Sequence, residues 1–312
     1  MARTMMVNGV KVNKPRKDYS IVTQRTSLGE KTFFTMMTVF CAIYCFSLIF
    51  PVVWLLIKSL EDAGMYDLNR YLHGWLYVPP ISAWKWSQYP KAFTELQLDG
   101  LNFAGMLINS AWWVGIGTFQ SIFWHATTAY IISKYRFKGR NFLYNLVIIN
   151  AIIPVYGTGG SGYKLINDLG LYDKGPIYLI FTTFGGLGGS FLTMVGLFGG
   201  ISWEYAEAVY VDGGGDTTVY FRIMLPQAWP MLSALAITSA VGLWNNYGGP
   251  LMYLPSTPTV ATGLYKLQSG IAYKGMPMYF CGLVITIIPV MIVYAFIAEK
   301  LMTNLSIGGL KG

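Results

Sequence analysis

The sequence predicts an all-α integral membrane protein with six transmembrane helices. Hydrophobic residues make up 54% of the 312-residue chain and charged residues only 12%, whereas soluble domains carry about 25% charged residues. The mean hydropathy is +0.45. The charges are also clustered, and six uncharged stretches separate them: residues 32–57, 100–133, 141–163, 175–203, 223–265 and 275–298.

Each uncharged stretch is at least 23 residues long, and about 20 apolar residues are enough to cross a bilayer as a helix. The composition excludes an ordinary soluble enzyme, a disordered chain and a secreted disulfide scaffold. The three cysteines, Cys41, Cys45 and Cys281, lie in apolar stretches, and we expect small packing residues there; a metal or redox pair of Cys41 with Cys45 is the alternative. We expect no metal site and no cofactor.

Residues 1–31 are polar and basic and lack the short apolar core of a cleavable signal. The first apolar stretch is followed by Lys58 rather than by small residues that would suit cleavage. The sequence therefore predicts a cytoplasmic basic N-terminal segment over 1–31 and a six-helix transmembrane domain over 32–312.

The distribution of Lys and Arg predicts the orientation. Seven of these residues fall within 1–31, and the connection after the second stretch holds Lys134, Arg136, Lys138 and Arg140 without an acidic residue. The positive-inside rule places both groups in the cytoplasm, which gives an even number of spans and cytoplasmic N- and C-termini. The net charge of +8 then reflects membrane topology, and no nucleic-acid partner is expected.

The long connection over 58–99 would lie outside the cell. It holds Trp75, Trp84 and Trp86, and such rings suit a membrane–water interface. A contact surface for an external protein is the alternative.

The fourth stretch carries small residues four apart, which favour close helix packing: Gly185, Gly189, Thr193, and then Gly196 and Gly200. We expect this span to pack against other helices through them.

The segment 202–226 departs from the positive-inside rule, because it would be cytoplasmic but is acidic. It contains one basic residue, Arg222, and four acidic residues: Glu204, Glu207, Asp212 and Asp216. It reads as two short helices separated by Gly213–Gly215, with Ser202 capping the first and Asp216 or Thr217 the second. Isolated helices below about 12–15 residues are marginal in water. We therefore expect this loop to dock against a cytoplasmic protein.

The same segment resembles the EAA loop of permease subunits from binding-protein-dependent ABC importers. The resemblance rests on Glu207, Ala208, Asp212, Gly213, Leu225 and Pro226. In that family the loop forms a coupling helix that docks in a cleft of the ATPase subunit. Val209 and Gly214 depart from the pattern, since alanine is usual at both positions.

Further motifs extend the resemblance to the sugar-importer branch typified by the second maltose-transporter permease: Phe50-Pro51, Lys58-Ser59-Leu60, Asn109-Ser110, Ile153-Pro154, Leu169-Gly170-Leu171, Trp244-Asn245 and Gly308-Gly309-Leu310-Lys311-Gly312. The resemblance implies a type I ABC importer (MetI-like) permease fold in the plasma or inner membrane. It also implies a heterodimer with a second permease subunit, a cytoplasmic ATPase dimer, an extracytoplasmic solute-binding protein and a saccharide substrate, with an oligosaccharide favoured.

The residues themselves argue that the energy comes from another chain. Ion-coupled carriers place Asp, Glu, Lys, Arg or His within the bilayer, but His125 is the single such residue in the six stretches, and the chain has no GxxxxGK[ST] phosphate loop. The GxGxxG match at Gly157, Gly159 and Gly162 lacks the strand–helix context of a nucleotide site. We expect a transport subunit and not an enzyme. An ABC importer for a non-sugar solute is the first alternative, followed by an ion-coupled carrier, a channel or a membrane enzyme.

A sugar path needs aromatic faces and uncharged hydrogen-bonding groups. The fifth stretch supplies Trp244, Asn245, Asn246 and Tyr247, which we take as candidates for the substrate path. Hydrogen bonding between helices is the alternative for each of them.

Overall fold

The computed structural model describes residues 4–7, 10–13, 28–152, 158–182, 189–270 and 275–307. The chain divides into two compact units, Met1–Trp54 and Leu55–Gly312, which are described separately. The described elements are predominantly helical, as the sequence predicts, and the strands among them form two short hairpins.

The first unit contains a small hairpin and most of helix α1. Strand β1 (Thr4–Val7) pairs antiparallel with β2 (Val10–Asn13), and Val7 faces Val10 in the register. This hairpin falls in the segment expected to be only polar and basic, where Val10-Lys11-Val12-Asn13 alternates apolar and polar residues as a strand does. Helix α1 (Leu28–Ser59) contains the first predicted span and is long and apolar enough to cross a membrane.

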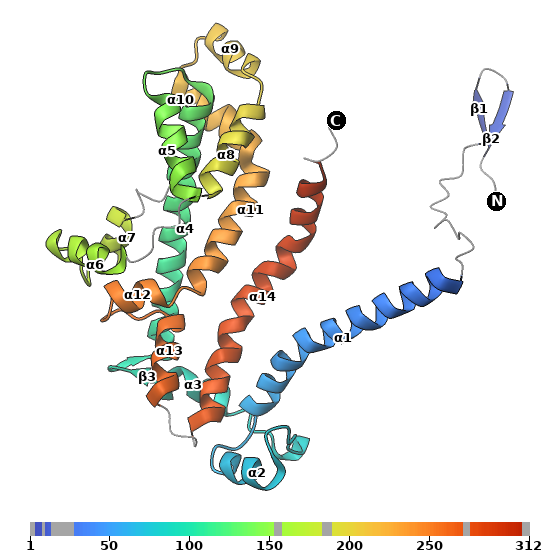
Figure 1. The fold of residues 1–312 in the computed structure, drawn as a ribbon, viewed down its shortest axis with the longest axis vertical. Helices are drawn as coiled ribbons and strands as arrows, with labels where there is room; N and C mark the ends of the chain where they lie inside the picture. The colour runs from blue at the N-terminus through green and yellow to red at the C-terminus, as the bar shows by residue number, and fades with distance from the viewer. Residues whose placement is uncertain are drawn as a thin grey trace. The chain divides into compact units, whose positions relative to one another are not determined.

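The second unit begins with the end of α1 and continues through seventeen elements (Figure 1). In order they are α2 (Tyr66–His73), η1 (Ile81–Ala83), α3 (Gln88–Glu95), β3 (Gln97–Leu98), β4 (Leu101–Asn102), α4 (Phe103–Lys134), α5 (Arg140–Ile152), α6 (Thr158–Asp168), α7 (Pro176–Thr182), α8 (Gly189–Gly200), α9 (Glu204–Val211), α10 (Asp216–Thr218), η3 (Val219–Met224), α11 (Leu225–Trp244), α12 (Gly248–Tyr253), α13 (Val260–Gly270) and α14 (Met276–Ile307).

The six uncharged stretches do not each form one helix. The first, second and sixth lie in the single long helices α1, α4 and α14, but the third is divided between α5 and α6 and the fourth between α7 and α8. The fifth comprises α11, α12 and α13. Among the described helices, Leu28–Ser59 and Met276–Ala295 are long and hydropathic enough to span a membrane by themselves. Lack of charge permits burial in lipid but does not determine where a helix breaks; Pro154 of the third stretch lies outside the described residues.

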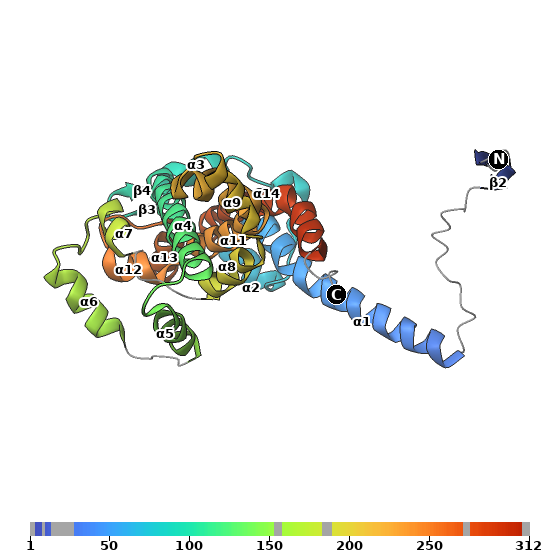
Figure 2. The same ribbon diagram turned by 90° about the horizontal axis from the view of Figure 1, so that it is seen from above.

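Helix α4 is the common support of the second unit and contributes to three buried clusters. Near its start, Phe103 and Met106 pack with residues of α3, α13 and α14. In its middle, Trp113 packs with residues of α6 and α7 and with Leu254. Toward its end, Tyr130 and its neighbours pack with α8, η3 and α11. Helices α8 and α11 make the most extensive contacts with α4, and both views show the three helices side by side (Figure 2).

Helix α8 packs through a different face from the one predicted. Phe191, Met194 and Phe198 are fully buried against α4, whereas Thr193 and Gly196 lie exposed. Large apolar side chains and not the small-residue stripe therefore make this contact within the chain. Gly185 lies outside the described residues.

Candidate functional site

The segment 202–226 begins as predicted, with a short helix and a glycine break. Ser202 Oγ accepts a hydrogen bond from the backbone N–H of Glu204 at 3.3 Å, at the start of α9. After the break, α10 is a single turn that continues through the π-helical η3 into α11. The predicted second short helix is therefore joined to the long α11. Pro226 is the second residue of α11, and because the helix is continuous with η3, Pro226 has no N–H to donate to a carbonyl of the preceding π-helical turn.

A Schellman motif ends α9 and forms the break. The N–H of Gly214 donates to the carbonyl of Val209 at 2.8 Å, and the N–H of Gly213 donates to the carbonyl of Tyr210 at 3.0 Å. This motif requires a left-handed residue, and Gly213 has φ +80°. Glycine adopts that conformation without the penalty that a Cβ atom brings.

The two departures from the EAA pattern, Val209 and Gly214, compensate for each other sterically. A Cβ atom built at Gly214 would lie 2.5 Å from Val209 Cγ1 and 3.0 Å from the Val209 carbonyl oxygen. The valine side chain therefore fills the space that an alanine at position 214 would need. The larger residue at 209 and the missing side chain at 214 compensate one another.

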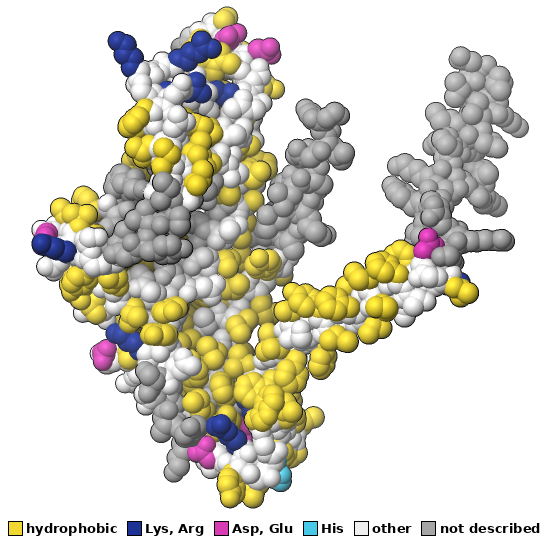
Figure 3. Space-filling model, in the orientation of Figure 1, with side chains coloured by type: hydrophobic (Ala, Val, Ile, Leu, Met, Phe, Trp, Pro, Cys, Tyr) yellow, Lys and Arg dark blue, Asp and Glu magenta, His cyan; other side chains and the backbone are white. Residues whose placement is uncertain are grey.

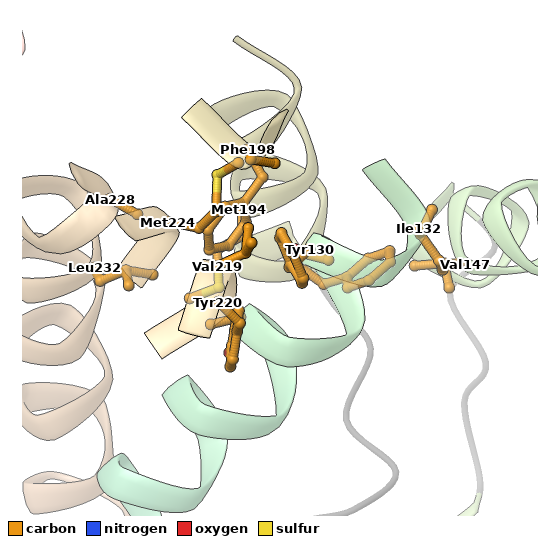
Figure 4. Packing of buried hydrophobic residues seen from close by; sticks show 14 residues of the cluster. Tyr130, Ile132, Val147, Met194, Phe198, Val219, Tyr220, Met224, Ala228 and Leu232 are labelled. Carbon is orange, nitrogen blue, oxygen red and sulfur yellow. The ribbon is translucent and has the colours of Figure 1, made fainter. Parts of the chain in front are cut away.

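The inner face of the segment belongs to the core at the end of α4. Ala206 of α9 and Val219 and Met224 of η3 are fully buried. Figure 4 shows the η3 side chains between those of α4, α8 and α11. The segment is thus packed against three long helices.

Polar contacts fix the same segment to the end of α4. Asp216 Oδ1 accepts hydrogen bonds from the hydroxyls of Tyr210 at 2.5 Å and Tyr135 at 3.0 Å. These two bonds lower the pKa of the Asp216 carboxyl, because they stabilise its charged form. The bond from Tyr210 has the larger effect on this pKa. The Lys134 ammonium donates to the carbonyl of Ile201, just after α8; burial lowers the pKa of Lys134.

The sequence reasoning missed Tyr135, Tyr210 and Lys134. Tyr135 and Asp216 are 81 residues apart, and no local pattern pairs them. These contacts place the basic connection 134–140 and the acidic segment at the same end of the second unit.

The outer face of the hairpin carries the predicted coupling residues. Glu207, Ala208, Asp212 and Gly213 are all exposed around α9 and its end, beside Val211, which is 87% exposed. Acidic side chains gather at the α9 end in Figure 3. Leu225 is half-buried and Pro226 exposed where the hairpin joins α11. The structure therefore brings the first four residues together and places Leu225 and Pro226 at the base.

The four candidates for the substrate path differ in their contacts. Trp244 Nε1 donates to the carbonyl of Thr286 on α14 at 3.2 Å, which fits a helix–helix contact. Asn246 Oδ1 accepts from the N–H of Gly249 at 2.9 Å and so caps α12.

The other two candidates, Asn245 and Tyr247, are exposed. The Asn245 amide donates to the carbonyl of Val241, within α11 itself, and the Tyr247 ring stacks on Tyr265 at 4.5 Å. The alternative of hydrogen bonding between helices therefore suits Trp244, Asn246 makes a local bond at the start of α12, and Asn245 and Tyr247 are accessible.

Comparison with known proteins gives relatives along nearly the whole chain. No protein-family model matches it. The chain is 27% identical over 279 residues to the arabinooligosaccharides transport system permease protein AraQ of Halalkalibacterium halodurans, covering 89% of this chain and 96% of that protein. It is 25% identical over 269 residues to the diacetylchitobiose uptake system permease protein NgcG of Streptomyces coelicolor, covering 83% of each.

A solved structure has the same fold. A chain of a bacterial ABC transporter involved in the import of the acidic polysaccharide alginate matches with a TM-score of 0.72 and 20% sequence identity, over 89% of this chain and 99% of that one. The fold and the sequence relatives agree: the chain has the fold of a chain from an ABC importer and is similar in sequence, along most of its length, to permease proteins named for oligosaccharide uptake.

Proposed function

We propose that the chain forms half of the translocation path of an ATP-driven, binding-protein-dependent importer for a saccharide, with an oligosaccharide favoured. The observation that carries the proposal is the exposed EAA-like face of Glu207, Ala208, Asp212 and Gly213 on a hairpin packed into the bundle. The names of the relatives support the substrate class. Its partners would be a second permease subunit, a cytoplasmic ATPase dimer and an extracytoplasmic solute-binding protein.

The proposed topology has six spans in the cell membrane, with both termini in the cytoplasm. The basic connection and the hairpin lie at the same end of the second unit, held there by the contacts of Lys134 with Ile201 and of Tyr135 with Asp216. By the positive-inside rule, this end would be cytoplasmic. Helices α2 and α3 lie at the other end of the second unit (Figure 1). In this arrangement the third, fourth and fifth spans each include more than one of the described helices.

The proposed mechanism is alternating access driven through the hairpin. Closure of the ATPase dimer on ATP would move α9, and the connection of α10 and η3 to α11 would carry that motion into the bundle. The contacts of Asp216 and Lys134 would make α4 and α8 move with it. Such coupling requires contacts that differ between the inward-open and outward-open states.

The solute path is proposed to lie between the two permease subunits, where Asn245 and Tyr247 could reach it. An importer for a non-sugar solute is the alternative, because these two residues suit many polar solutes. An ion-coupled carrier or channel has less support, because the uncharged stretches hold no acidic residue.

The test is transport by the assembled importer in proteoliposomes. Gly213→Trp forces a large side chain into a left-handed position, whereas Gly213→Asn is the matched control because Asn tolerates that conformation. We expect Gly213→Trp and Glu207→Ala to abolish uptake while membrane insertion is intact and ATP hydrolysis becomes uncoupled from uptake. Uptake should be retained in Gly213→Asn.

Unchanged uptake in Gly213→Trp would refute the proposal that the hairpin transmits the motion of the ATPase to the bundle. Accumulation of a solute against its gradient by this chain alone, without an ATPase, would refute the proposed energy source.

A further inference from the structure

A surface of exposed apolar side chains follows α2, at the opposite end from the hairpin. Residues 71–84 contain no Asp, Glu, Lys or Arg. Tyr71 is 86% exposed, Trp75 59% and Ile81 76%, and Leu72, Leu76 and Val78 are also more than half exposed. Contiguous apolar surface of this kind marks a contact with a membrane or another molecule. We call residues 65–86 the outer loop.

A group of polar side chains, Lys58, Glu61 and Asn69, lies at the base of the outer loop, and we call it the polar node. Lys58 Nζ and Glu61 Oε2 form an ion pair of 2.8 Å, with both side chains almost completely buried. Asn69 of α2 donates to Glu61 Oε1 at 2.7 Å. The Lys58 ammonium also lies 5.6 Å from the ring centroid of Tyr66 and 5.9 Å from that of Tyr77. These contacts fix the outer loop to the bundle. They therefore also fix the position of the backbone that carries the exposed side chains.

Contacts with α14 place this base beside the first turns of an apolar helix. The apolar span of α14 starts at Met276, after Lys274. The rings of Tyr66 and Phe280 are 6.1 Å apart, and Cys281 Sγ donates to the carbonyl of Ser59 at 3.2 Å. At 1.5 Å per residue, Phe280 and Cys281 lie about 6–8 Å inside the start of the span.

The residue that follows α3, Leu96, contacts α14 at the same level. A Cβ atom at Gly282 would lie 2.8 Å from Leu96 Cδ1, so the residue after α3 packs directly on the α14 backbone. The platform formed by α2 and α3 is thus docked on the first turns of α14 through Tyr66 and Leu96.

From this depth we propose that the outer loop is an interfacial anchor, seated in the outer leaflet at the boundary of lipid headgroups and acyl chains. Tyr71 and Trp75 would lie at headgroup level, as aromatic side chains do, and Leu72, Leu76 and Ile81 would enter the acyl boundary. Interfacial segments bury their apolar face about 5–10 Å below the headgroups, and the base of the outer loop contacts α14 within its first two turns. The proposal rests on the membrane orientation under the proposed function.

Lipid accounts for this surface better than an external protein. A protein docking on Trp75 and Ile81 would have to enter the headgroup layer, because their base lies beside the α14 span. The uncharged composition of 71–84 also suits lipid, whereas the rim of a typical protein interface is polar.

The test places a fluorescent bimane label on single cysteines in the full chain, in nanodiscs of phosphatidylethanolamine and phosphatidylglycerol. The background carries Cys41→Ser and Cys45→Ser, while buried Cys281 is kept. Trp75→Cys and Ile81→Cys probe the outer loop, and Lys91→Cys, on the exposed face of α3, is the matched control. Lack of reaction of Cys281 with maleimide reports that the platform is still docked.

We expect nitroxide lipids labelled near the headgroup to quench the labels at 75 and 81, and aqueous iodide to quench them several-fold less than the label at 91. Iodide quenching at 75 and 81 equal to that at 91 would overturn the proposal. So would iodide quenching that is removed by adding the solute-binding protein, since this would assign the surface to protein docking. If Cys281 reacts with maleimide in the Trp75→Cys variant, the platform is no longer docked in that variant. The quenching of the label in Ile81→Cys then tests the proposal by itself. Coupling by the hairpin is measured separately, so either proposal can fail without the other.

Discussion

Gly214 shows how a single residue adapts a common loop to one sequence. Its missing Cβ leaves the space that Val209 Cγ1 occupies. We predict that Gly214→Ala destabilises the protein by about 1–3 kcal/mol through overpacking. Val209→Ala combined with Gly214→Ala should recover the part of that loss that comes from the Val209 side chain, but not the part from its carbonyl oxygen, as measured by thermal unfolding of the full chain in detergent.

The control for this pair is Gly215→Ala. A Cβ atom at Gly215 meets no other atom within 4 Å, and the backbone there has φ −106°, so this change should be nearly neutral. If the effects at 209 and 214 simply add, the two residues are independent and the compensation is wrong.

Asp216 is the residue through which pH acts on the hairpin. Its pKa is lowered by the hydrogen bonds from Tyr210 and Tyr135. A carboxyl with a depressed folded-state pKa contributes stability above its unfolded pKa of about 3.9 and loses that stability as the pH falls through the folded value. We predict that the hairpin stays docked at mildly acidic pH and loosens only below about pH 4.

Hydrogen exchange of residues 204–218, corrected for the intrinsic rate at each pH, measures this effect. Asp216→Asn should raise exchange at neutral pH, because the amide accepts weaker hydrogen bonds than the carboxylate. Tyr210→Phe should do the same to a smaller extent, since Tyr135 still donates. Equal exchange in Asp216→Asn and the unchanged protein would show that apolar packing alone holds the hairpin.

At the scale of elements, the Lys58–Glu61 pair joins the end of α1 to α2 and α3. Gln88 of α3 donates to the Glu61 carbonyl at 2.5 Å, in addition to the contact from Asn69. Glu61→Gln leaves the Lys58 charge buried without its partner. We predict a loss of about 3–5 kcal/mol, and a smaller loss when Lys58→Met accompanies Glu61→Leu.

The matched control is the exposed pair of Lys85 and Asp62, 3.7 Å apart and about half accessible to solvent. Asp62→Asn should cost about 0–1 kcal/mol in the same thermal unfolding measurement. A similar small loss in Glu61→Gln would mean that water reaches the node and that it does not fix the outer loop.

At the scale of the whole molecule, the prediction concerns which end faces the cytoplasm. Cysteines at Lys91 on α3 and Lys164 on α6 should react with a membrane-impermeant maleimide added to intact cells. A cysteine at Lys138, in the basic connection, should react only after the membrane is opened. Labelling of Lys138→Cys in intact cells would reverse the proposed orientation.

The sequence anticipated part of the architecture, for identifiable reasons. The long helices α4 and α14 follow from uncharged apolar runs, and the α9 break follows from Gly213. The divisions of the third, fourth and fifth stretches were not predicted, because a run without charge is compatible with both a continuous and a broken helix. The packing of α8 against other helices was predicted correctly, but the large side chains that make its contact with α4 were not, since small residues four apart do not show which side chains lie between the helices.

The apolar composition typical of a membrane protein, the acidic segment 202–226 and its EAA-like pattern could all be read from the sequence itself. They depend on composition and on turn chemistry within a few residues of the chain. The tertiary structure alone decided the contacts between distant segments: Tyr135 with Asp216, Lys134 with Ile201, and Tyr66 with Phe280 of α14. The physical reason is that such contacts depend on how complete helices pack, and many packings satisfy the same local pattern.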